Sequence, residues 1–165
     1  MRVAHWSVAG LVVVELLNDA GANPWHRYLG YAAAALVATR LGWGLVSPRY
    51  ARLSTMATTV GEMSAYLKSR PSAPSSSYVG HNPLGAVMAF TLWSLVLLVA
   101  VTGWLLGLDS FWGDQTLQQL HAALAYALAA FAVVHVCGVL AASRTQQENL
   151  IKAMVTGNKS LPGSR

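Results

Sequence analysis

The stretch "LHAALAYALAAFAVVHVCGVL", residues 120–140, carries no formal charge but contains two histidines, His121 and His135. A helix of about 20 residues is long enough to cross the hydrocarbon core of a bilayer. Fourteen helical residues separate two side chains by roughly 21 Å along the axis and by only about 40° around it. We therefore expect both imidazoles on one side of a single helix, at two depths in the membrane.

The composition of the whole chain is that of a membrane protein. Of its 165 residues, 55% are hydrophobic and 10% are charged, whereas about 25% are charged in soluble domains. Four apolar runs, the shortest of which includes Glu15, lie at 3–17, 28–46, 84–108 and 117–142. We predict an all-α membrane protein, a four-transmembrane-helix bundle in one domain, 1–165. The alternative for the first run is a cleaved secretory signal ending in "AGA" at 20–22.

The basic residues indicate the orientation of these helices. The loop 47–83 and the tail 143–165 together hold eight of the eleven lysines and arginines. The positive-inside rule places both segments, and with them both termini, in the cytoplasm. The opposite connections contain Asp19, Asp109 and Asp114 and are expected outside. The net charge of +5 is explained by this topology, so no nucleic-acid partner is needed to account for it.

Four histidines fall at two depths in this topology. His5 and His135 are expected at the inner, cytoplasmic level, and His26 and His121 at the outer, periplasmic level. A single histidine could simply be buried and hydrogen-bonded to a carbonyl, but polar side chains inside membranes are more often functional. One zinc or copper ion would need all its ligands around one centre. Haem iron needs only two axial protein ligands, so the pattern predicts two bis-histidine haems.

The attachment of these haems follows from the cysteine content. Covalent attachment uses C-x-x-C-H, and Cys137 is the only cysteine in the chain. We therefore predict two non-covalently bound haems of the b type. Cys137 itself is expected to fill space in an apolar helix.

Three arginines are candidates for pairing with haem propionates. Arg40 lies fourteen residues after His26 and so returns to the same helix face at the inner level. It could pair with an inner propionate, alongside Arg2, or extend towards cytoplasmic headgroups. Arg27, the basic residue of the outer side, could serve the outer haem in the same way.

Three further residues each have two interpretations. Gly30, one turn after His26, could let the outer haem approach the helix or could serve close helix packing. Glu15 could carry protons in quinone chemistry, but we expect it to reach the headgroup region. His81, in the basic loop, is expected to be a surface residue rather than a ligand.

Several motifs together resemble the prokaryotic cytochrome b561 family, and in particular its nickel-iron hydrogenase b-type cytochrome branch. They are "RVAHW" at 2–6, "HRYLGYAAAALVATRLGWGLVSPRYARL" at 26–53, "HNPLGA" at 81–86, the histidine pair of the last helix, and "ENLIKAMVTGNK" at 148–159. The resemblance implies a four-helix bundle with two haems bound by histidines of the first, second and fourth helices. These positions match His5, His26, His121 and His135. Members usually have several residues before the "HW" motif, so we expect the inner haem to be held less firmly here.

The resemblance also implies a function. It suggests electron transfer across the bacterial inner membrane, between the quinone pool and a periplasmic redox partner, either a hydrogenase or a c-type cytochrome. A superoxide:quinone oxidoreductase of the b561 type is an alternative. A non-redox membrane module, with structural or metal-transporting histidines, is another. The sequence leaves open whether the chain forms a homo-oligomer and which way the electrons run.

Overall fold

The structure, a computed structural model, describes residues 2–18, 24–46, 83–145 and 149–157. All regular secondary structure in these residues is helical. The elements are α1 (Arg2–Leu17), α2 (Pro24–Val46), α5 (Pro83–Leu105), the short 3₁₀-helix η3 (Asp109–Phe111), α6 (Gln115–Thr145) and α7 (Leu150–Thr156). The basic loop up to residue 82, with His81, and residues 146–148 and 158–165 of the tail lie outside the described residues, so the predictions made for them are not addressed.

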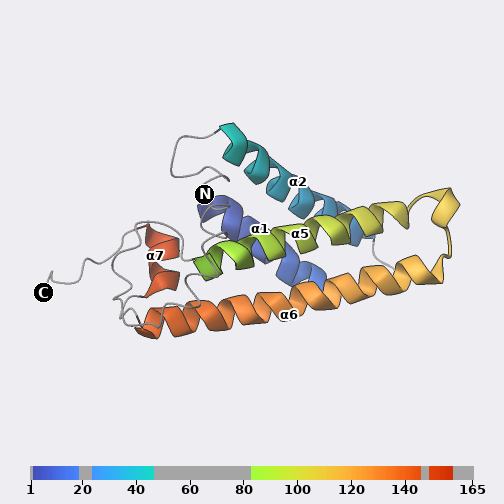
Figure 1. The fold of residues 1–165 in the computed structure, drawn as a ribbon. Coiled ribbons are helices and arrows are strands. Elements are labelled where there is room, and N and C mark those ends of the chain that lie inside the picture. Colours follow the sequence, from blue (N-terminus) through green and yellow to red (C-terminus); the bar gives the residue numbers. More distant parts are fainter. Residues whose placement is uncertain (1, 19–23, 47–82, 146–148, 158–165) are drawn as a thin grey trace, which may run out of the picture.

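The four long helices pack into one bundle (Figure 1). α5 and α6 lie side by side and antiparallel, joined through η3, and they make the most extensive contact. α1 packs against α2, and α2 packs against α5. The N-terminus of α1 lies at the same end of the bundle as α7, and η3 lies at the opposite end. We refer to these ends as the inner end and the outer end.

Two of the described helices are long and apolar enough to cross a membrane, judged by length and composition. They are Leu84–Leu105 and Gln115–Thr145. α1 has 16 residues and would span about 24 Å at 1.5 Å per residue, which is less than the roughly 30 Å of a hydrocarbon core. That α1 and α2 also cross the membrane stays a prediction.

The buried core is small and lies between α2, α5 and α6. Its members are Ala33, Val37, Val96 and Leu128. Many large apolar side chains point outward instead, including Val133 on α6, which is 63% exposed. A water-soluble protein rarely exposes so much apolar surface, whereas a bilayer covers it. The outward side chains therefore agree with a membrane location.

The turn between α5 and α6 explains why both helices depart from their predicted bounds. α5 ends at Leu105 rather than at residue 108, because the chain leaves the helix through a turn and η3. Gly113 has a φ of 78°, a conformation that costs glycine little. Asp114 Oδ1 then accepts a hydrogen bond from the Leu117 backbone amide at 3.0 Å. This side-chain cap allows α6 to begin two residues before its predicted start.

The sequence analysis missed α7, since it treated 143–165 as a tail. Asn149 caps the start of this helix by accepting from the Lys152 amide at 2.8 Å, and Gly157 ends it with a φ of 84°. Ser143 Oγ, near the end of α6, accepts from the Leu150 amide at 3.2 Å. An N-capping asparagine and a C-terminal glycine flanking an apolar segment are recognisable signals in the sequence. α7 is therefore a helix packed against the inner end of α6.

Candidate functional site

The structure brings the four histidines together as two pairs. At the inner end, the ring centroids of His5 and His135 are 6.3 Å apart, with ring planes inclined by 58°. Towards the outer end, those of His26 and His121 are 6.1 Å apart, with planes inclined by 83°. α6 contributes one histidine to each pair, α1 the inner partner and α2 the outer one. These are the pairs that the sequence analysis grouped by depth.

The spacing within each pair suits two axial ligands of one iron atom. A first-row metal binds an imidazole nitrogen at about 2 Å, so two imidazoles on opposite sides of the metal have centroids roughly 6.3 Å apart. Both measured separations are close to this value. Among the described residues there is no group of three or more histidine, cysteine or acidic side chains that could hold a metal ion. Two protein ligands at each site suit a macrocycle that supplies the remaining four itself.

A threonine of α5 contacts one histidine of the outer pair. Thr102 Oγ1 lies 2.9 Å from His121 Nδ1. The same oxygen lies 2.9 Å from the Leu98 carbonyl and 3.0 Å from the Val99 carbonyl. A hydroxyl has one proton to donate, so when that proton goes to a carbonyl the oxygen accepts from Nδ1–H. This tautomer of His121 leaves Nε2 free to bind iron.

A glycine beside this threonine gives the His121 ring its space. A Cβ placed on Gly103 would lie 3.2 Å from His121 Cε1, which is a tight contact. The absence of a side chain lets the ring lie directly against α5. Thr102 and Gly103 were not singled out in the sequence analysis, because nothing in α5 itself indicates which of its faces meets α6.

Glu15 does not extend to the headgroups as expected but turns towards α2. Its Oε2 forms an ion pair with Nδ1 of His26, and the side chain of Glu15 is only 14% exposed. The contact is not aligned as a hydrogen bond, and the other oxygen, Oε1, is buried without a hydrogen-bond partner among the described residues. Both ligands of the outer pair therefore have a polar group at Nδ1: a hydroxyl for His121 and a carboxylate for His26.

The three candidate arginines have different surroundings. Arg40 lies over the Trp93 ring, 5.6 Å from its centroid, and its NH1 is buried with no hydrogen-bond partner among the described residues. A buried guanidinium nitrogen without a partner is suited to an acidic group such as a propionate. Arg27 lies at the start of α2, against Gly107 of the turn after α5.

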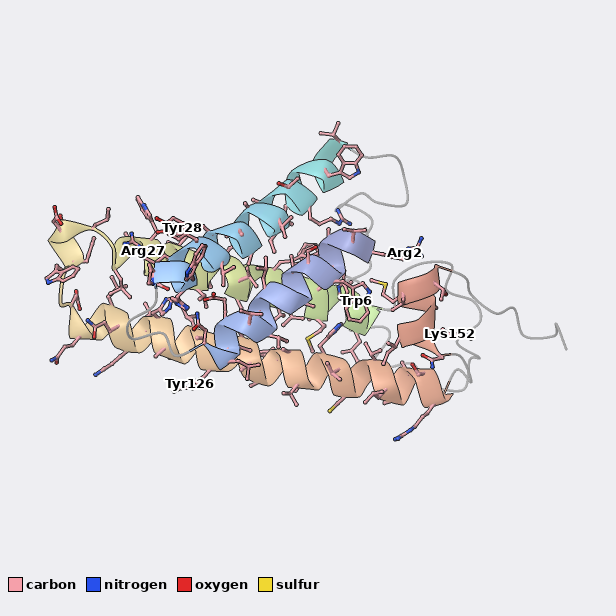
Figure 2. The ribbon with its side chains drawn as sticks, turned by 180° about the vertical axis from the view of Figure 1, so that it is seen from behind. Arg2, Trp6, Arg27, Tyr28, Tyr126 and Lys152 are labelled. Carbon is pink, nitrogen blue, oxygen red and sulfur yellow. The ribbon has the colours of Figure 1, made fainter. Side chains whose placement is uncertain are left out.

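Arg2 is placed differently from its predicted role. Its NH1 donates to the Val155 carbonyl of α7 at 3.3 Å, and its guanidinium lies against Gly157. Figure 2 shows Arg2 at the inner end near α7, which carries Lys152, whereas Arg27 lies at the start of α2 towards the outer end. Arg2 therefore joins the start of α1 to the end of α7, and its pairing with a propionate stays a prediction.

Gly30 has open space around it. A Cβ at this position would meet nothing within 4 Å, so close packing between the described helices does not require a glycine here. The other interpretation, approach of the outer haem, stays a prediction.

A comparison with protein families gave a match over most of the chain. A family model described as prokaryotic cytochrome b561 matches residues 1–157. Comparisons with curated proteins and with solved structures gave no match. The matched region includes all four paired histidines.

Proposed function

The chain belongs to the prokaryotic cytochrome b561 family of membrane b-type electron-transfer cytochromes, and on this premise we propose that it carries two haems and passes electrons between the quinone pool and a periplasmic redox partner. His5 and His135 would bind the iron of the inner haem, and His26 and His121 that of the outer haem. The partner at the outer side would be a hydrogenase or a c-type cytochrome. The protein would lie in the bacterial inner membrane with both termini in the cytoplasm.

The observation that carries this proposal is the recurrence of one ring spacing at two ends of a bundle. Centroid separations of 6.1 and 6.3 Å arise from three helices whose histidines are far apart in the sequence. A single chance pair of histidines would not repeat the geometry. Two haems at two depths supply a route for electrons through the low-dielectric interior, which one haem would not.

The residues of the chain have separate tasks in this function. When bound, each haem supplies the one-electron chemistry, and the protein sets its position and potential. The histidines bind the iron atoms, and Thr102 orients one of them. Arg40, with a buried NH1 lacking a protein partner, is suited to bind a propionate of the inner haem.

The test begins with haem content and spectrum. The protein purified in detergent is expected to contain two haems b per chain and to show b-type bands on reduction. Added quinone should reoxidise the reduced haems. A matched control is the double variant His121→Ala, His135→Ala, which lacks one ligand of each pair and should show neither haem nor reoxidation. A protein without haem would exclude electron transfer and favour a non-redox role.

A further inference from the structure

Glu15 is an unusual residue for its position. Among the described acidic residues it alone lies within a long helix of the bundle, because Asp109 and Asp114 belong to the turn between α5 and α6. Ionisable side chains within membrane helices are costly, and they generally have a partner inside the protein. Glu15 has such a partner in His26, on the neighbouring helix.

The contact involves the nitrogen of His26 that is available when the other nitrogen binds iron. Glu15 Oε2 forms an ion pair with Nδ1, and the described residues give this nitrogen no hydrogen bond. A ligating histidine nearly always donates its second N–H to a carboxylate, a carbonyl or a water, and a carboxylate makes the imidazole a stronger electron donor to the metal.

We propose that Glu15 is a positioning residue for His26 whose carboxylate accepts from Nδ1–H and makes the outer haem the lower-potential haem of the two. The inference rests on the proposed dihaem function and adds an order of potentials to it. A more electron-rich imidazole stabilises ferric iron over ferrous iron, and hydrogen bonding around a haem ligand is one of the means by which a protein sets the potential.

The surroundings of the inner pair are expected to raise the reduction potential of the inner haem rather than lower it. In the described part of the chain, no hydrogen bond is made by the rings of His5 and His135, and no carboxylate forms an ion pair with either. Among the described residues, the charged side chains at the inner end are cationic, Arg2 of α1 and Lys152 of α7 among them, and Arg40 is expected at the same level. Cations favour the reduced, less positive haem. Electrons that reach the outer haem are therefore expected to pass to the inner one.

The test is a redox titration of Glu15→Gln against the unmutated protein. Glutamine keeps an oxygen acceptor near Nδ1 but removes the charge. We expect both haems to be retained and the ferrous-to-ferric ratio of the outer haem at a fixed applied potential to rise about tenfold, which for a one-electron couple corresponds to about 59 mV. The near-infrared charge-transfer band of the ferric outer haem should shift towards that of a neutral imidazole ligand. The inner haem should keep both its potential and its band.

Asp109→Asn is the matched control. It removes one carboxylate at the same end of the molecule, from an exposed position in η3. If the inference is correct, this variant leaves both potentials nearly unchanged. An equal rise in Asp109→Asn and in Glu15→Gln would mean that general electrostatics, not contact with His26, sets the potential, and would contradict the inference.

A spectrum of the unmutated protein provides a test that does not depend on the stability of a variant. The two ferric haems should give two charge-transfer bands, with one displaced towards imidazolate character. A single band typical of neutral imidazole, or an unchanged outer potential in Glu15→Gln, would overturn the role of Glu15 while leaving the dihaem function intact. Absence of haem from the unmutated protein would instead overturn the proposed function, and this inference with it.

Discussion

The outer and inner histidine pairs share one spacing but differ in what holds them. In the outer pair, Thr102 lies at Nδ1 of His121 and Glu15 at Nδ1 of His26. In the inner pair, the ring of His5 packs edge-on against Trp6, with centroids 5.4 Å apart, and the described residues give neither ring a hydrogen bond. The outer histidines thus have polar contacts, whereas His5 packs against an aromatic ring on a short helix. From this difference we expect the two sites to be unequal in stability and in potential despite their similar ring spacing.

The largest expected effect is the loss of one haem when one histidine of a pair is replaced. His121→Ala should remove the outer haem and leave the inner one, and His135→Ala should do the reverse, because each change deletes one of only two protein ligands. Haem content per chain, measured with the visible spectrum, should fall from two to one in either variant. His81→Ala, a histidine predicted not to be a ligand, is the control and should keep two. If either single variant lost both haems, the pairs would not be independent.

A smaller effect is expected from the hydroxyl that orients His121. Thr102→Val preserves the shape of the side chain but removes the acceptor for Nδ1–H. Loss of such a partner typically weakens metal binding by about 10–100-fold, so the outer haem should dissociate more readily while the inner haem is unaffected. Competition for haem by apomyoglobin measures both sites. The control is Thr102→Ser, which keeps the hydroxyl, and equal weakening in the serine and valine variants would show that shape, not the hydrogen bond, matters.

Gly103→Ala tests the contact beneath the same ring. Its Cβ would lie 3.2 Å from His121 Cε1, so the ring must move by a few tenths of an ångström. We expect a cost to outer haem binding of about 1 kcal/mol, at the lower end of the range for overpacking. Gly85→Ala, on the same helix and with nothing within 4 Å of the added Cβ, should leave haem binding unchanged. Thermal release of haem, followed by absorbance, compares the two variants.

The smallest expected effect concerns the inner pair and the start of α1. We expect the inner haem to be released before the outer one on heating, because His5 lies in the first turn of α1, and a first turn frays since its amide groups lack intrahelical partners. Arg2 opposes this fraying through its hydrogen bond to the Val155 carbonyl. Arg2→Ala should therefore lower the release temperature of the inner haem slightly, by an amount equivalent to about 0.5 kcal/mol, because the hydrogen bond is exposed and lies at the lower end of the usual range.

Lys152→Ala is the comparison for this change, since it removes a basic side chain of α7 itself rather than the contact between α1 and α7. It should have no such effect on haem release. Earlier loss of the outer haem from the unmutated protein would show that the short first helix is not the weaker support.

The sequence predicted those features of the structure that depend on the geometry of a single helix. Fourteen residues between His121 and His135 determine their depth and their common face, because helical rise and twist are nearly constant. The topology expected from the basic residues grouped His5 with His135 and His26 with His121 before any helix was packed. The extent of α7 could also have been predicted, because its capping residues Asn149 and Gly157 are local signals.

Only the tertiary structure decided which side chains meet the histidines from neighbouring helices. The approach of Glu15 to His26 and of Thr102 to His121 depends on the rotation of α1 and α5 about their own axes. Both helices are apolar around nearly their whole circumference, so their hydrophobic pattern does not select the face that turns inward. The same holds for Arg2, whose partner lies in a helix more than 150 residues later in the chain. The sequence by itself therefore determined where each of the four histidines lies along its helix. Packing between the helices determined which side chains surround each histidine.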